Sequence, residues 1–223
     1  MKKILFSLMV LAVVIPAGAD YYIAGDFNGW NSAGQLMIDN GDGTYSATVS
    51  GLVGGARHEF KVTQGTWDWS RPGANSWFYA DEDGSITITY NSNWVSDGWK
   101  TEQDRIGLST DPGNWTIAGS FQGWDNANPA TAMTSLGGGI YLFSQLFTAG
   151  EYWFKPVVTG TWDSIAENER SVGTWDMYVN LPVDSVLKVY VDSFGGVVRT
   201  EIVPEPTAML LLGIGSLLAI RRK

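Results

Sequence analysis

Residues 22–31 read YIAGDFNGWN, and residues 116–125 read TIAGSFQGWD. Six of these ten positions are identical at a constant offset of 94. Further along, the tetrapeptide Gly-Thr-Trp-Asp at residues 65–68 recurs at residues 160–163, so the offset barely drifts. Self-similarity at a fixed period indicates repeated structural units. The sequence therefore predicts two copies of one domain with small differences in loop length.

Short runs between these motifs alternate polar and apolar residues, as in TYSATV at residues 44–49 and SITITY at residues 85–90. Alternation with period two, broken by Gly, Asn and Asp turns, is typical of antiparallel β-sandwiches. We predict an all-β fold of two tandem immunoglobulin-like sandwiches, flanked by an N-terminal signal peptide and a short C-terminal hydrophobic helix. The expected divisions are a signal peptide at 1–19, a first module at 20–103, a linker at 104–113, a second module at 114–203 and a sorting signal at 204–223.

The composition narrows the classes of partner. The chain of 223 residues has a net charge of −9 and no cysteine, so thiol chemistry and stabilising disulfides are excluded. An acidic chain repels phosphate backbones, and we expect no nucleic-acid partner. Eleven tryptophans with 27 glycines describe an aromatic-rich, turn-rich β protein that could bind a neutral polymer.

The N-terminus has the three parts of a secretory signal peptide. Lys2 and Lys3 precede an apolar stretch at residues 4–15, and the small residues Ala17 and Ala19 precede Asp20. We expect signal peptidase to cleave after Ala19, and the alternative is an uncleaved anchor.

The C-terminus combines a rigid spacer, an apolar segment and a basic end. Pro204, Glu205 and Pro206 precede 14 largely apolar residues at 207–220, which are followed by Arg-Arg-Lys. As a helix this segment spans about 21 Å, short of the ~30 Å hydrocarbon core of a bilayer. The terminal cations favour a cytoplasmic C-terminus, with the remainder outside.

The order of these three features resembles the PEP-CTERM sorting signal. The resemblance implies transient anchoring in the inner membrane through residues 207–220 and cleavage by an exosortase near Pro204, Glu205 and Pro206. It also implies release or attachment at the surface of a Gram-negative bacterium that makes exopolysaccharide. An ordinary single-span tail anchor is the alternative.

Each copy carries one tryptophan after Gly-x-Phe-x-Gly, a lysine on a central strand and a second tryptophan in the next hairpin. A sugar ring has an apolar C–H face and a rim of hydroxyls, so a binder needs flat aromatic rings and a few polar partners. The candidate carbohydrate-binding residues are Trp30, Lys61 and Trp67 in the first copy, and Trp124, Lys155 and Trp162 in the second.

These motifs resemble the glycogen- and starch-binding early-set β-sandwich modules of isoamylase-type enzymes and of the AMP-activated kinase β subunit. In that family the tryptophan after Phe-Asn-x, the strand lysine and the hairpin tryptophan contact the glucan. The resemblance implies the same role for the six residues above. Pro156, which follows the second lysine, departs from the family pattern.

A structural interpretation stands beside the binding one, because a sandwich without disulfides needs tryptophans in its core. Trp69, Trp77, Trp94, Trp99, Trp115, Trp153 and Trp175 are interpreted as mainly structural. The lysines are also explained as ordinary solvent-facing strand residues. Near-complete burial of the four candidate tryptophans would favour a structural matrix protein.

Catalytic and metal chemistry find little support in the sequence. The acidic run at residues 39–44 lacks the distal glutamate of a calcium loop and fits a hairpin turn. His58 is replaced by Tyr152 in the second copy, which argues against a catalytic base. Asp163 and Glu167 stay open as a glycosidase pair, because only their separation in space decides that role. We expect no enzyme, no metal and no cofactor, and the leading hypothesis is a surface or secreted protein that binds an α-glucan or exopolysaccharide.

Overall fold

Every strand pairing among the described residues is antiparallel, which confirms the predicted all-β class. The structure is a computed structural model and describes residues 20–96, 98–99, 101–166 and 169–205. The predicted signal peptide with Ala19, and the predicted membrane segment at 207–220 with Pro206, lie outside the described residues. Within the described part of the chain, no helix is long and apolar enough to cross a membrane.

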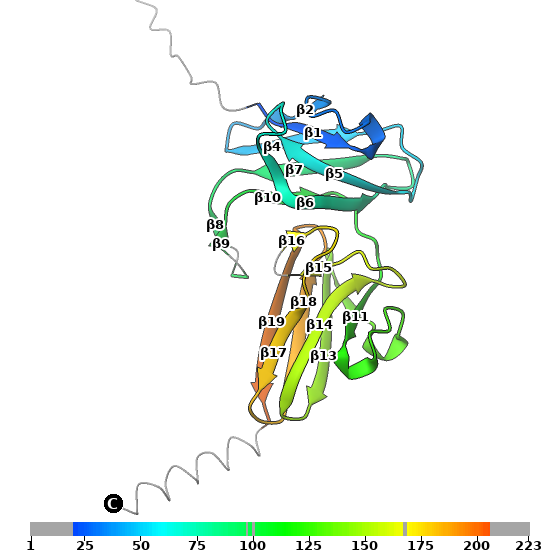
Figure 1. Cartoon of the computed structure of the whole chain (residues 1–223), viewed down its shortest axis with the longest axis vertical. Coiled ribbons are helices and arrows are strands. Elements are labelled where there is room, and N and C mark those ends of the chain that lie inside the picture. The colour runs from blue at the N-terminus through cyan, green and yellow to red at the C-terminus, as the bar shows by residue number, and fades with distance from the viewer. Residues whose placement is uncertain (1–19, 97, 100, 167–168, 206–223) are drawn as a thin grey trace, which may run out of the picture.

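The first module is a sandwich of two four-stranded sheets, in the orders β2-β1-β5-β6 and β10-β7-β4-β3 (Figure 1). Its elements are β1 (Tyr22–Gly25), the 3-10 helix η1 (Asp26–Asn28), β2 (Gln35–Leu36), β3 (Ile38–Asp39), β4 (Thr44–Val49), β5 (Arg57–Thr63), β6 (Ser70–Tyr79), β7 (Ile86–Asn91) and β10 (Arg105–Leu108). A short hairpin of β8 (Val95–Ser96) and β9 (Thr101–Glu102) projects between β7 and β10.

The second module packs the sheet β11-β14-β17 on the sheet β12-β13-β18-β19. Its elements are β11 (Trp115–Gly119), η2 (Ser120–Gln122), η3 (Pro129–Thr131), β12 (Thr134–Gly137), β13 (Ile140–Phe147), β14 (Gly150–Val158), β15 (Ile165–Ala166), β16 (Glu169–Arg170), β17 (Met177–Leu181), β18 (Ser185–Asp192) and β19 (Val197–Pro204). The pair β15-β16 forms a separate ribbon at the end nearest the first module.

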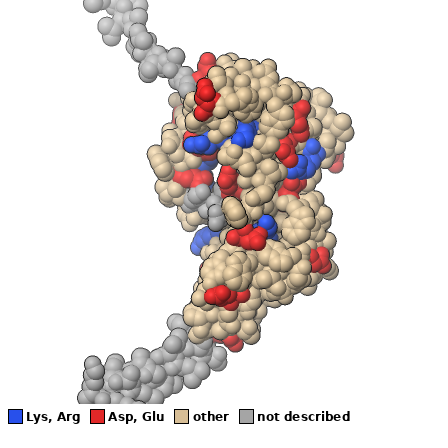
Figure 2. All heavy atoms as spheres, viewed as in Figure 1, with Lys and Arg blue, Asp and Glu red and all other residues tan. Residues whose placement is uncertain are grey.

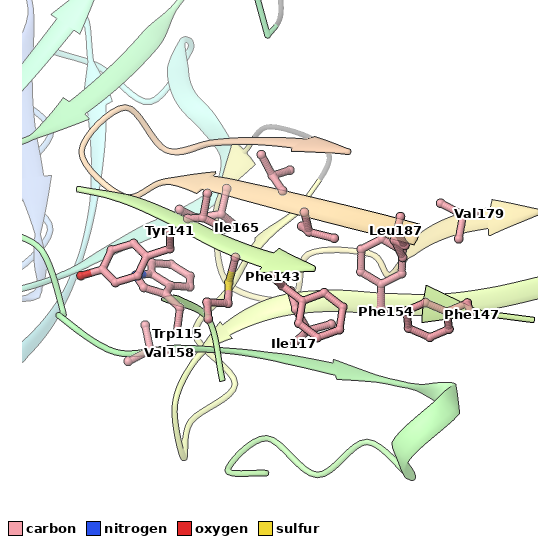
Figure 3. Packing of buried hydrophobic residues seen from close by; sticks show 14 of the residues in the cluster. Trp115, Ile117, Tyr141, Phe143, Phe147, Phe154, Val158, Ile165, Val179 and Leu187 are labelled. Carbon is pink, nitrogen blue, oxygen red and sulfur yellow. The ribbon is translucent and has the colours of Figure 1, made fainter. Parts of the chain in front are cut away.

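Every second side chain along the strands points into the core of its module, as the period-two pattern predicts. Ile86, Ile88 and Tyr90 of β7 are buried, while the residues between them are partly exposed. In the second module, aromatic and aliphatic side chains from both sheets meet in the same way, with Phe143 and Phe154 among them (Figure 3). Because the chain has no cysteine, this burial supplies the main stabilising free energy.

The boundary between the modules lies later than the sequence indicates. Arg105–Leu108, inside the predicted linker at 104–113, forms β10 and pairs with β7. Leu108 is buried and Ile106 packs against the first core, which accounts for the extra edge strand. The connection between the sandwiches is therefore residues 109–114.

The two modules share a buried interface. Trp77 of β6 is 0% exposed and belongs to the hydrophobic cluster of the second module, with its ring centroid 6.1 Å from that of Trp115. Its indole nitrogen donates to the Ser164 carbonyl at 3.2 Å. The guanidinium of the buried Arg170 lies 5.0 Å from the centroid of the Trp77 ring. β16 lies against β6 in Figure 1, so the end of the second module covers the outer face of the β5-β6 pair.

The start of the predicted sorting signal is held in the last strand. Pro204 pairs with Ser185 across β18 and β19, and the Glu205 amide donates to the Asp184 carbonyl at 3.0 Å. Pro204 and Glu205, which the sequence assigns to the sorting signal, are therefore bonded to the second module.

Candidate functional site

The motif that defines the repeat builds the same turn in both copies. At the end of β1, Gly25 packs so closely on Phe27 that a Cβ atom would lie 2.3 Å from the ring, and at Gly119, the end of β11, the distance to Phe121 would be 2.6 Å. Gly29 then ends the 3-10 helix in the left-handed region, with φ of 65°. The two glycines and the partly buried phenylalanine together direct the chain into the following tryptophan.

That tryptophan also has a left-handed backbone. The φ angle is 59° at Trp30 and 61° at Trp124, and each amide donates to the carbonyl of the first motif glycine, at 2.8 Å and 3.0 Å. A bulky residue in this region costs about 1–2 kcal/mol. Two copies of such strain point to a requirement for the indole ring at this position.

In the first module the turn brings two tryptophans together. The Trp30 ring is half-buried, and its centroid lies 6.4 Å from that of Trp67, which is 49% exposed. The Trp67 hairpin is held by Ser32, whose hydroxyl donates to the Gly65 carbonyl at 3.0 Å. The structure therefore brings two of the three predicted binding residues of the first copy into one open aromatic pair.

Lys61 points outward from β5 on the same sheet, but its ammonium group is already engaged. Nζ donates to the carbonyls of Pro72 at 3.2 Å and Gly73 at 2.5 Å. Burial lowers the pKa of Lys61 below its ordinary value. In this arrangement Lys61 fixes the neighbouring β6 backbone, and a ligand would have to share its donors.

The second module repeats the layout with a wider spacing. Trp162 is 56% exposed, and its hairpin is tied to the Trp124 loop by Asn126, whose side-chain amide donates to the Thr161 carbonyl at 3.0 Å. Across the described chain, close ring pairs include Trp30 with Trp67 but not Trp124 with Trp162. Lys155 pairs with Asp176 at 2.8 Å, and Pro156 lies within an uninterrupted β14 opposite Ile117.

Three tryptophans that the sequence assigned to structure are exposed. Trp94 and Trp175 lie on loops, and Trp153 is on β14, 43% exposed. Trp77 and Trp115, by contrast, are buried. The signal for Trp153 was present in the sequence, because it alternates with the buried Phe154 and so shares the outward face with Lys155.

A polar cleft of about 560 Å³ lies between the modules. Trp94, Arg71, Asp104 and Glu169 line it, together with the buried Arg170. Arg71 donates to Asp104 at 3.0 Å, so two of the charges in the cleft neutralise each other.

The other candidate chemical groups have structural partners. A ring nitrogen of His58 lies 2.8 Å from the Asp26 carboxylate, and its ring packs against Phe27. Asp163 is bound by Arg57 and Tyr79, and its proposed catalytic partner Glu167 lies outside the described residues. Among the residues described, no group of three or more His, Asp and Glu side chains is placed to hold a metal ion.

Comparison with known proteins identifies a sorting motif at the C-terminus of the chain. Residues 203–223 match the PEP-CTERM protein-sorting motif, so the chain carries an export-associated sorting signal with a C-terminal anchor. A 54-residue stretch is 41% identical to an alpha-amylase of Niallia circulans and covers 23% of this chain and 4% of that protein. The pullulanase from Bacillus acidopullulyticus aligns with 86% of this chain and 31% of its own, at 12% identity and a TM-score of 0.30, too low to bear on function.

Proposed function

We propose that this protein is a non-catalytic polysaccharide-binding protein of the cell surface or extracellular matrix of a Gram-negative bacterium. Signal peptidase cleaves it after Ala19, residues 207–220 anchor it transiently in the inner membrane, and exosortase processes it near Pro204, Glu205 and Pro206. Its ligand is an α-glucan or an exopolysaccharide. The binding residues are those of the two aromatic sites, Trp30, Lys61 and Trp67 with Trp124, Lys155 and Trp162.

The observation that carries this proposal is the strained, repeated placement of Trp30 and Trp124. Core packing alone does not require a left-handed tryptophan, since a residue with ordinary φ would fill space without the conformational cost. In the first module the strain holds Trp30 beside an exposed partner ring. Two inclined indoles with open faces suit the C–H faces of successive sugar residues.

The comparisons with known proteins also support an exported polysaccharide-binding protein. The local identity to an alpha-amylase is consistent with a sugar-binding ancestry for part of the chain. The sorting motif supports export. A non-catalytic role is favoured because the carboxylate of Asp163 is engaged by Arg57 and Tyr79.

Retention on insoluble starch, and on a panel of insoluble exopolysaccharides, tests the proposal. We expect the purified exported protein to be retained, and Trp67→Ala/Trp162→Ala to bind at least about tenfold more weakly, which corresponds to ~1.4 kcal/mol. Trp94→Ala is the matched control, since it removes an exposed tryptophan outside both sites. Unchanged retention in the double variant would overturn the assigned sites and favour a structural role.

A further inference from the structure

The outer face of the β14-β17 pair carries a second exposed aromatic cluster. Trp153 and Tyr178 lie directly opposite each other across the two strands, with ring centroids 5.1 Å apart and planes inclined by 47°. They are 43% and 49% exposed, while the next residues along each strand, Phe154 and Val179, point into the core (Figure 3). Two large rings left in water on a regular sheet face indicate a surface that is covered in use.

Polar groups flank these rings on both sides. Partial desolvation and the Glu151 carboxylate raise the pKa of Tyr178, and Glu151 lies two residues before Trp153 on β14. Beyond Trp153 on the same face, the Lys155 ammonium is paired with Asp176. An aromatic floor with carboxylates and an ammonium at its margins offers both the stacking and the hydrogen bonding that a sugar requires.

The repeat shows what happens to the equivalent face in the first module. At the offset of 94, Glu59 corresponds to Trp153, and Glu59 pairs across the sheet with Trp77 as Trp153 pairs with Tyr178. In the first module this face is the interface with the second module, and Trp77 is buried there. The same face in the second module is open.

A further module does not fit this open face in the same way. The interface depends on Arg57 of β5, which holds Asp163. In the second module, Glu151 occupies the position that Arg57 has in the first. If the first module of another copy docked on this face, Asp68 would occupy the position of Asp163. Two carboxylates would face each other where the real interface has an ion pair, so the charges exclude a second copy docked in this manner.

The charge of the surface also selects among polymers. Glu151 and Asp176 outnumber Lys155, and Asp176 already neutralises that lysine. In Figure 2 the visible face of the second module away from the junction shows acidic and neutral side chains and no basic ones. This acidic surface would repel an anionic polysaccharide, whereas a neutral polysaccharide would meet no electrostatic repulsion.

We propose that Trp153 and Tyr178 form a third glycan-binding surface, on the outer face of β14 and β17, for a neutral hexose polymer. This inference rests on the proposed function in that the chain binds polysaccharide, but it uses neither hairpin tryptophan. The 47° inclination between the rings suits a chain whose successive sugars turn, as they do in α-glucans, since a flat chain cannot stack on both planes.

Affinity electrophoresis in gels that contain glycogen tests the surface, with alginate gels as the anionic comparison. We expect Trp153→Ala/Tyr178→Ala to weaken retardation by glycogen at least about fivefold, and we expect alginate to retard no variant. Tyr178→Phe keeps the ring and is expected to retain most of the binding. Leu146→Ala, an exposed apolar residue on the other sheet of the module, is the matched control. Unfolding curves in urea establish that each variant is folded.

The outcomes separate this inference from the proposed function. If glycogen retards the wild type and Trp67→Ala/Trp162→Ala abolishes that retardation while Trp153→Ala/Tyr178→Ala leaves it unchanged, the third surface is refuted and the hairpin sites stand. If only Trp153→Ala/Tyr178→Ala weakens retardation, the third surface stands and the hairpin sites fail. Retardation by alginate alone overturns the assignment of a neutral ligand, and the absence of retardation by glycogen overturns the third surface.

Discussion

The carboxylate of Asp163 in the second module lies 2.7 Å from Nε of Arg57 in the first. Nη2 of the same guanidinium donates to it at 2.8 Å, and the Tyr79 hydroxyl donates at 2.6 Å. The pKa of Arg57 is raised, chiefly because Asp163 accepts its hydrogen bonds. Asp68, which holds the same place in the first Gly-Thr-Trp-Asp hairpin, is exposed and bonds only locally to Thr66 among the described contacts.

These two aspartates provide an internally controlled stability test. Asp163→Asn should lower the free energy of unfolding by about 1–3 kcal/mol, because it removes a charge that satisfies two donors at the interface. Asp68→Asn should change it by less than about 0.5 kcal/mol, as surface substitutions usually do. Urea unfolding at neutral pH measures both, and equal effects would contradict a specific role for Asp163.

Trp77 couples the folding of the two modules. Trp77→Ala should cost about 3–5 kcal/mol, the range for truncating a buried tryptophan, and should separate one calorimetric transition into two. The exposed Trp94 is the control, and Trp94→Ala should stay within about 0.5 kcal/mol. A single transition that survives in Trp77→Ala would show that the modules do not depend on this contact.

The interface should weaken in alkali. Burial, reinforced by the hydrogen bond to Asp163, raises the pKa of Tyr79 to about 12, whereas an unfolded tyrosine titrates near 10. A raised pKa in the folded state means that the stabilisation is complete below pH ~10 and is lost as the pH rises towards 12. Burial also raises the pKa values of Tyr90 and Tyr141, so the slope in Tyr79→Phe should flatten without vanishing. Unfolding free energies at pH 9, 10.5 and 12 would show this, and identical slopes would count against it.

At the left-handed tryptophans, substitution by Asn and by Ala should differ in stability but not in binding. Asparagine tolerates this backbone region better than alanine, so Trp30→Asn should be more stable than Trp30→Ala by roughly 0.5–1 kcal/mol. Both variants should lose retention on starch to the same extent, because both lack the ring. The paired measurement at Trp124 should behave alike, and retained binding in either asparagine variant would contradict a ligand role for that ring.

The sandwiches could be predicted from the sequence because their signals are local. Alternation in segments such as residues 85–90 fixes which side chains enter the core, and the Gly-x-Phe-x-Gly-Trp motif fixes one turn through short-range packing. The exposed hairpin positions of Trp67 and Trp162 were predictable in the same way. These features depend on residues close together in the chain.

The junction could not be predicted, because its burial comes from the other module. Trp77 points out of its own sheet, where alternation alone predicts a solvent-exposed residue, and only the docked second module encloses it. β10 was missed because four residues with a central glycine carry too short a pattern to distinguish a strand from a linker. The exposed aromatic face at Trp153 was not predicted, because the sequence analysis assigned this tryptophan to the core of a sandwich without disulfides.

Under the proposed function, the burial of Trp77 fixes the distance between the two binding sites. Modules on a flexible linker engage a polymer at any spacing, and linker length alone sets their effective concentration. Here the shared core holds the Trp67 and Trp162 hairpins at one separation and one relative direction. A polymer that reaches both must present its segments at that interval, so branching and strand spacing, as well as the identity of the sugar, decide how tightly the protein holds.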